Sequence, residues 1–259
     1  MNLNRSTLTP LRSALLCLFA VLLTLGAERA QSEEATLAVA SNFRPAMEEL
    51  QTLFERDTGH RLKISYGATG QFHAQIELGA PFHLFLSADS VRPRLLSHKG
   101  QTASEPPRTY AIGKLALWSP DLPQLTAETL KHGDFRFLAI ANADIAPYGT
   151  AGREVIDRLE LADVLKDRIV QGNNVGQAFV FVQTGNAELG FVALSQILSL
   201  PTRERGTHWL PPPEFYTPIR QDAVLLERGT QNQAARDFFA FLFSEKAGAV
   251  IERSGYAVP

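Results

Sequence analysis

The chain has 259 residues, of which 45% are hydrophobic, and its 25 Lys and Arg residues nearly balance its 27 Asp and Glu residues. This composition is typical of a folded globular protein and excludes a disordered chain. The formal net charge is −2 and the sequence has no basic stripe, so nucleic acid is not an expected partner. The one cysteine, Cys17, excludes a fold held by internal disulfides.

Residues 1–30 have the pattern of a secretory signal peptide. Arg5 and Arg12 give a positive start, residues 14–25 form an apolar run without charge, and small residues follow up to Ala30. The run is too short to span a bilayer. A retained membrane anchor is the alternative, but no stop-transfer pattern follows. We therefore predict export and a remaining chain of about 230 residues, enough for two modest lobes.

From Thr36 onward, short apolar runs alternate with segments whose apolar residues recur every three or four positions, which predicts an α/β fold. The expected strands cover residues 37–40, 62–66, 84–86, 115–118, 137–141, 190–194 and 223–226. The expected helices cover residues 43–59, 70–76, 150–159, 175–183, 232–242 and 246–253. We find no internal repeat in this pattern.

Three of the turns between a strand and a helix carry donor groups. Ser41 and Asn42 form the first, residues 67–70 with Thr69 form the second, and residues 147–150 with Tyr148 form the third. A helix N-terminus presents unpaired N–H groups and a partial positive charge, which together suit an anion. Each turn alone is explained by ordinary N-capping. The three together favour an anion site.

These turns contain no Lys or Arg, unlike sites that neutralise phosphate with arginines. A neutral site of this kind suits a fully ionised oxyanion, because an acid such as hydrogen phosphate requires an acceptor opposite its proton. The nearest carboxylate is Asp89, which we interpret as the cap of the helix that follows it.

Enzyme motifs are absent from the sequence. It has no Gly-x-Ser-x-Gly elbow, no His-Glu-x-x-His and no phosphate-binding loop that ends in Gly-Lys-Ser/Thr. We interpret the histidines as surface or capping residues; they are His60, His73, His83, His98, His132 and His208. The sequence therefore predicts a binding protein without catalytic residues, cofactor or directly bound metal.

Several segments resemble one known family. They are residues 38–43 (Ala-Val-Ala-Ser-Asn-Phe), 66–71 (Tyr-Gly-Ala-Thr-Gly-Gln), 75–89, 146–149, 174–176 and 188–195. Together they are similar to the molybdate-binding periplasmic proteins of ABC transporters, the ModA family. The stretch from Gln75 to Asp89 is the most specific of them.

The resemblance implies a two-lobed, hinged periplasmic binding protein fold of type II, in which each lobe is a mixed sheet flanked by helices. It also implies that Ser41, Asn42 and Thr69 bind the oxyanion from one lobe. Tyr148 and Val175 would bind it from the other lobe, Val175 through its backbone N–H. Some members have a tyrosine where this chain has Ala193, and Asn42 and Tyr148 are expected to replace that donor.

Lobe I is expected to hold residues 35–111 and 222–259, and lobe II residues 112–221. The two chain crossings between them would form the hinge. Residues 202–213 have no match in the family, and we expect them to cover lobe II.

The resemblance further implies a monomer in the periplasm that captures molybdate, and also tungstate, for an ABC transporter permease in the inner membrane. A receptor for another tetrahedral oxyanion such as sulfate, or a non-transport module on the same scaffold, is the alternative.

Overall fold

The structure is a computed structural model that describes residues 32–259, so the predicted signal peptide at residues 1–30 lies outside the described residues. Within the described range, no helix combines the length and the apolar character needed to cross a membrane. Residues 33–259 form one compact unit.

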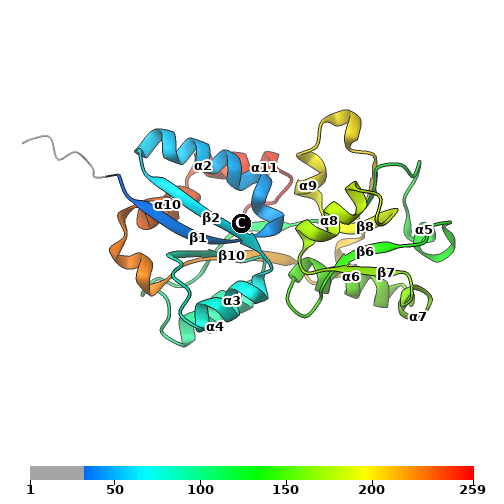
Figure 1. Cartoon of the computed structure of the whole chain (residues 1–259), viewed down its shortest axis with the longest axis horizontal. Helices are drawn as coiled ribbons and strands as arrows, with labels where there is room; N and C mark the ends of the chain where they lie inside the picture. The colour runs from blue at the N-terminus through cyan, green and yellow to red at the C-terminus, as the bar shows by residue number, and fades with distance from the viewer. Residues whose placement is uncertain (1–31) are drawn as a thin grey trace, which may run out of the picture. The chain divides into compact units, whose positions relative to one another are not determined.

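This unit is built on two mixed five-stranded sheets, with strand orders β2-β1-β3-β10-β4 and β7-β6-β8-β5-β9 (Figure 1). The first sheet contains β1 (Glu34–Ala40), β2 (Arg61–Gly67), β3 (Leu84–Leu86), β4 (Arg108–Gly113) and β10 (Ile219–Leu225). The second contains β5 (Leu115–Ser119), β6 (Leu138–Ala141), β7 (Ile169–Gly172), β8 (Leu189–Ala193) and β9 (Thr207–Trp209). We call the halves built on them lobe I and lobe II. The predicted two-lobed α/β fold is confirmed.

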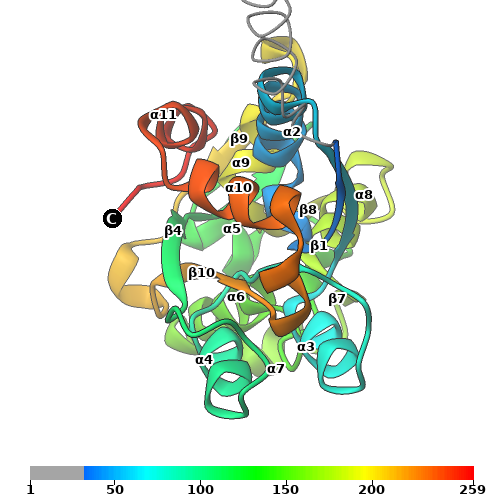
Figure 2. The same cartoon turned by 90° about the vertical axis from the view of Figure 1, so that its left-hand side faces the viewer.

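Helices flank both sheets. Those of lobe I are η1 (Ser41–Phe43), α2 (Arg44–Thr58), α3 (Thr69–Glu77), α4 (Val91–His98), η4 (Glu227–Gln231), α10 (Gln233–Leu242) and α11 (Glu245–Arg253). Those of lobe II are α5 (Ala127–His132), α6 (Pro147–Arg158), α7 (Ala162–Leu165), α8 (Val175–Gln183), α9 (Leu194–Leu198), η2 (Thr202–Glu204) and η3 (Pro213–Phe215). In lobe I, α2, α10 and α11 cover one face of the sheet and α3 and α4 cover the other (Figure 2).

Both faces of β1 are buried, because helices cover both faces of the lobe I sheet. Leu37 and Val39 join the core under α2 and α10, whereas Ala38 on the opposite face joins Phe72 and Phe85 under α3 and α4. A strand that is buried on both faces reads as a continuous apolar run. This is why the sequence predicted the strand so readily.

Three strands were not predicted, namely β4, β7 and β9. The last of them lies within the unmatched stretch 202–213 and pairs antiparallel with β5 as the edge strand of lobe II. The indole Nε1 of Trp118 donates to the carbonyl of Arg205 at 2.7 Å. This stretch therefore covers the edge of lobe II, as expected.

The chain passes between the sheets twice, from β4 to β5 and from β9 to β10. The lobe boundaries expected from the sequence, after residues 111 and 221, fall inside β4 and β10. They stay a prediction.

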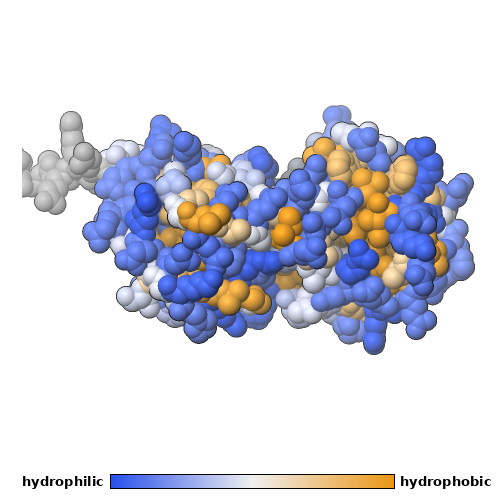
Figure 3. Space-filling view, turned by 60° about the horizontal axis from the view of Figure 1, so that its bottom comes forward, coloured by the Kyte–Doolittle hydropathy of each residue, from blue (hydrophilic) through white to orange (hydrophobic). Residues whose placement is uncertain are grey.

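The face of the molecule seen in Figure 3 is mostly hydrophilic, with separate apolar patches on both lobes. The exposed large apolar side chains are likewise divided between the lobes; they are Leu78, Val91, Leu95, Val164, Val180 and Leu210. Such a surface agrees with the predicted globular class.

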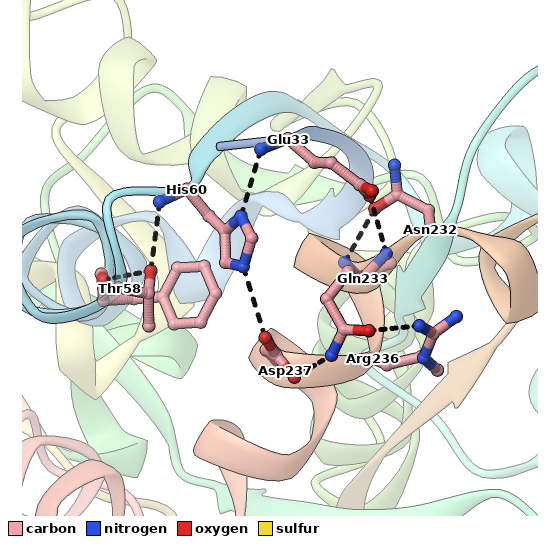
Figure 4. A network of polar contacts seen from close by, with 9 residues as sticks. Glu33, Thr58, His60, Asn232, Gln233, Arg236 and Asp237 are labelled. Carbon is pink, nitrogen blue, oxygen red and sulfur yellow. Dashed lines mark hydrogen bonds and ion pairs between the residues drawn. The ribbon is translucent and has the colours of Figure 1, made fainter. Parts of the chain in front are cut away.

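The interpretation of His60 as a surface or capping residue is wrong, because its side chain is buried and links two distant segments (Figure 4). The backbone N–H of Glu33 donates to its Nδ1 at 3.1 Å, and its Nε2 lies 3.2 Å from Oδ2 of Asp237 in α10. With Nδ1 accepting, the Nε2–H donates to the carboxylate. His60 thereby fixes the segment that leads into β1 against α10.

Phe238 of α10 gives a test of the lobe I core. Its ring is fully buried and lies edge-on to Phe54 of α2, with ring centroids 5.2 Å apart. Phe238→Ala is expected to lower the free energy of unfolding by about 3 to 5 kcal/mol, because it leaves a cavity. Denaturant unfolding measures this loss. Leu78→Ala is the control: Leu78 is 88% exposed and should change stability by less than about 0.5 kcal/mol. If both substitutions lowered the free energy of unfolding by the same amount, Phe238 would not belong to the core.

Candidate functional site

A small pocket of about 10 Å³, which we call the cavity, lies between the two lobes. This volume corresponds to about one water-sized sphere, so the two lobes lie close together at this point. All five residues that the sequence singled out line it. The full lining is Ala40, Ser41, Asn42, Gly67, Ala68, Thr69, Ala88, Ala146, Pro147, Tyr148, Asn174 and Val175.

Three helices begin at this cavity. Thr69 is the first residue of α3, Pro147 the first of α6 and Val175 the first of α8. The first N–H groups of a helix have no partner within the helix, and they carry the positive end of its dipole. The cavity is therefore surrounded by N–H donors from both lobes, an arrangement that suits an anion.

None of the lining residues carries a charge. Charged side chains lie instead in two larger hollows beside the cavity. One, of about 660 Å³, is lined in part by Arg44 and Glu48, and the other, of about 390 Å³, in part by Arg92 and Glu154. Asp89 in the second hollow accepts from the backbone N–H of Arg92 at 2.9 Å, which confirms the prediction that it caps α4.

The hydroxyls of Ser41 and Thr69 both act as acceptors toward the protein. Oγ1 of Thr69 accepts the backbone N–H of Ala88 at 3.0 Å, and Oγ of Ser41 accepts the backbone N–H of Gly176 at 3.2 Å. A hydroxyl that accepts in this way still has its own hydrogen to donate. Each can therefore offer an O–H to a ligand in the cavity.

The Asn42 side chain is not the outward donor that the sequence suggested. Its Nδ2 donates to Oε1 of Gln221 at 2.9 Å and to the hydroxyl of Tyr256 at 3.0 Å, which uses both of its hydrogens. Its Oδ1 is buried without a hydrogen-bond partner among the described residues. Because Oδ1 is an acceptor, it cannot bind an anion that lacks a proton. Asn42 can therefore bind such an anion only through its backbone N–H.

The phenol of Tyr148 lies beside residues that do not line the cavity. Its hydroxyl accepts from Nε2 of Gln221 at 3.3 Å and lies so close to Gly113 that a Cβ there would be 2.2 Å away. Neither Gln221 nor Gly113 lines the cavity. Burial raises the pKa of the Tyr148 phenol well above 10, so it stays protonated. As the second residue of α6, Tyr148 brings its backbone N–H to the cavity. Its phenol only accepts from Gln221 and can still donate its own hydrogen, so the predicted role of the phenol stays a prediction.

Gln221 is the centre of a buried network that sequence reasoning missed. Its Oε1 accepts from Nδ2 of Asn42 and from the hydroxyl of Tyr110, at 2.9 and 3.1 Å, while its Nε2 reaches Tyr148 of lobe II. Ser195 of α9 adds a second link between the lobes, because its hydroxyl donates to the carbonyl of Asn42 at 3.0 Å. The signal in the sequence is weak, because Gln221 is one of three consecutive polar residues, Arg220 to Asp222, at the start of β10.

No group of three or more His, Cys, Asp or Glu side chains that could hold a metal ion is found in residues 32–259. The donors at the cavity are hydroxyl and backbone N–H groups, which bind the oxygens of an anion rather than a bare cation.

A family model described as a bacterial extracellular solute-binding protein matches residues 35–257. The molybdate-binding protein ModA of Azotobacter vinelandii is 44% identical over 231 residues, which cover 88% of this chain and 92% of the relative. ModA of Rhodobacter capsulatus is 40% identical, over 88% of this chain and 89% of the relative. The solved periplasmic molybdate-binding protein of Azotobacter vinelandii matches with a TM-score of 0.83 at 41% identity, covering 87% of this chain and 99% of that one.

The chain belongs to the ModA family of bacterial extracellular solute-binding proteins. The fold of this family extends to more distant proteins. The sulfate-binding protein SubI from Mycobacterium tuberculosis matches with a TM-score of 0.70 but only 13% identity, a likeness that shows the fold alone.

Replacing Gln221 tests the network behind the cavity. Gln221→Leu removes its hydrogen bonds to Asn42, Tyr110 and Tyr148 and leaves the buried Tyr148 hydroxyl without a partner. We expect the free energy of unfolding to fall by about 2 to 4 kcal/mol, measured by denaturant unfolding. Gln183→Leu, on the exposed face of α8, is the control and should change it by less than about 0.5 kcal/mol. If Gln221→Leu left the free energy of unfolding unchanged, the network would not stabilise the fold.

Proposed function

We propose that this protein is a periplasmic solute-binding protein that captures molybdate, and also tungstate, for the permease of an ABC transporter. The observation that carries this proposal is the convergence of three helix N-termini on a cavity without charge. The names of the relatives support the choice of ligand, since both of the relatives that are at least 40% identical are called molybdate-binding proteins.

A buried anion requires compensation for its lost water shell. Here the compensation comes from dipoles that the fold already holds in place: backbone N–H groups at α3, α6 and α8 and the hydroxyls of Ser41 and Thr69. Hydrogen bonds to an ionised acceptor are roughly twice as strong as those between neutral groups. A ligand of a few atoms with four equivalent oxygens can accept from both lobes at once.

The two-lobed arrangement also explains how the permease could recognise the protein that carries a ligand. The chain passes between the sheets twice, and we infer that these two crossings act as the hinge, with residues 35–111 and 222–259 moving as lobe I against 112–221 as lobe II. A ligand that bridges the lobes favours the closed state, which the permease can distinguish from the open one. The protein would act as a monomer, without a cofactor and without catalysis.

Export is the remaining part of the proposal. Residues 1–30 would act as the signal peptide, and the rest of the chain would work in the periplasm. The pattern of these residues supports this placement, as does the match to a family of extracellular solute-binding proteins.

Calorimetric titration with molybdate, tungstate, sulfate and phosphate at matched salt tests the ligand. We expect tight binding of molybdate and tungstate and at least about a hundredfold weaker binding of sulfate and phosphate. The affinity for molybdate should stay constant between about pH 7 and about pH 9, because Tyr148, whose pKa is raised, is the one titratable residue of the lining. If the protein bound sulfate most tightly, the ligand would be sulfate and not molybdate. If it bound none of the four anions, the proposal would be wrong.

The role of Tyr148 is tested by Tyr148→Phe. The variant keeps the backbone N–H at the cavity and loses the phenolic O–H together with the hydrogen bond that it accepts from Gln221. We expect its molybdate affinity to stay within about threefold of the wild type, while its stability falls by about 1 kcal/mol. Calorimetry and denaturant unfolding measure the two quantities. A large loss of affinity at unchanged stability would show that the phenol itself binds the anion.

A further inference from the structure

We propose that Gly70 is the residue that permits the two lobes to close, and that any side chain at this position holds them apart. Gly70 lies in lobe I, one residue after Thr69, and it contacts Ile145 of lobe II just before α6. The proposal rests on the proposed function, because closure around a ligand is what gives the contact its purpose. Beyond that function, the proposal names one residue that allows the lobes to close although it does not contact the ligand.

The approach between the two residues is close. The backbone N–H of Gly70 donates to the carbonyl of Ile145 at 2.8 Å. A Cβ on Gly70 would lie 2.9 Å from the Cα, 3.0 Å from the Cβ and 3.1 Å from the carbonyl oxygen of Ile145. Two of these three atoms belong to the backbone and cannot rotate away. A methyl group at position 70 therefore has no space while the lobes are closed.

The local structure of lobe I gives no reason for a glycine here. Gly70 is the second residue of α3, and it is not among the glycines with a positive φ. Within a helix, alanine is favoured over glycine by about 0.5 to 1 kcal/mol. The three atoms nearest to the missing side chain all belong to Ile145 in the other lobe. The requirement for glycine thus comes from the contact between lobes.

Gly176 of lobe II makes the reciprocal contact on the other side of the cavity. Its backbone N–H donates to Oγ of Ser41, and a Cβ at this position would lie 3.2 Å from the Cβ of Ser41 and 3.0 Å from Oδ1 of Asn174. These neighbours are side-chain atoms, which can shift by a few tenths of an ångström. We therefore expect alanine at position 176 to be tolerated better than alanine at position 70.

Loss of closure lowers affinity even when every ligand-binding group is intact. The apparent affinity of a ligand falls in proportion to the fraction of protein that can reach the binding-competent state. In the partly open state, the donors of α3 and those of α6 and α8 no longer face the same anion. Gly70→Ala should therefore weaken binding while it leaves the folding of lobe I intact.

The experiment combines binding, stability and lobe distance. Spin labels are placed through Leu78→Cys in lobe I and Val164→Cys in lobe II, both exposed; the only natural cysteine, Cys17, is removed with the leader. Distance distributions are recorded by pulsed electron resonance with and without molybdate. Affinity is measured by calorimetry and the unliganded melting temperature by calorimetric scanning. The variants are Gly70→Ala, Gly70→Val and Gly176→Ala, with Gly248→Ala as control because nothing lies within 4 Å of its missing Cβ.

We expect Gly70→Ala to bind molybdate at least about tenfold more weakly than the wild type, and Gly70→Val more weakly still. The short-distance population that molybdate produces in the wild type should be lost in both, at an unchanged or raised unliganded melting temperature. Gly176→Ala should show a smaller loss, and Gly248→Ala should match the wild type.

Wild-type closure and affinity in Gly70→Ala would overturn the proposal. A lowered melting temperature without ligand would also overturn it, because glycine would then serve the folding of lobe I. Failure of the wild type to bind any of the four anions is a failure of the proposed function instead. In that case the distance distributions recorded without ligand test the role of Gly70. If the wild type has a closed population that Gly70→Ala lacks, the proposal is supported. If the wild type has no closed population, the proposal is wrong.

Discussion

In the proposed function, the arrangement of the molecule depends on one constraint, the need to hold an anion away from water without a countercharge. The desolvation of an unpaired charge costs several kcal/mol even after the protein relaxes. In the proposed function, three helix N-termini and two hydroxyls supply the compensation, and they work together only when both lobes contribute. Neither lobe alone surrounds the cavity. The two-lobed fold, the hinge and the close contact between the lobes therefore follow from the same electrostatic requirement.

Sheet topology places these groups at one point. The parallel strands β1, β2 and β3 of lobe I, and β6 and β7 of lobe II, end toward the cleft, and the helices that follow begin there. The crevice at the carboxyl ends of parallel strands is the usual binding place in open α/β sheets. Behind it, Gln221 connects side chains of both lobes next to the chain crossings. This buried network holds the side chains of Asn42 and Tyr148 in place behind the cavity.

The sequence predicted the positions of the site better than its chemistry. Ser41 and Thr69 were found because hydroxyl residues at strand-to-helix turns are a local pattern, whereas Val175 was named only through the resemblance to the family. The outward role of the Asn42 amide could not be judged from local sequence, because its partners Gln221 and Tyr256 lie 179 and 214 residues away in the chain. The role of the Tyr148 phenol stays a prediction. The strands β7 (Ile-Val-Gln-Gly) and β9 (Thr-His-Trp) were missed because they are short and only partly buried. No apolar run marks them, whereas β3 and β6 are equally short but fully buried and apolar.

The most direct test of the central claim is a crystal structure with molybdate, in which anomalous scattering locates the metal atom. The account predicts one strong peak in the cavity between the lobes, with the ligand oxygens accepting from Ser41, Thr69 and the first N–H groups of α6 and α8. It also predicts that no Lys or Arg side chain contacts them. A peak beside Arg44 or Arg92 in the flanking hollows would contradict the account, because the anion would then be held by charge and not by dipoles.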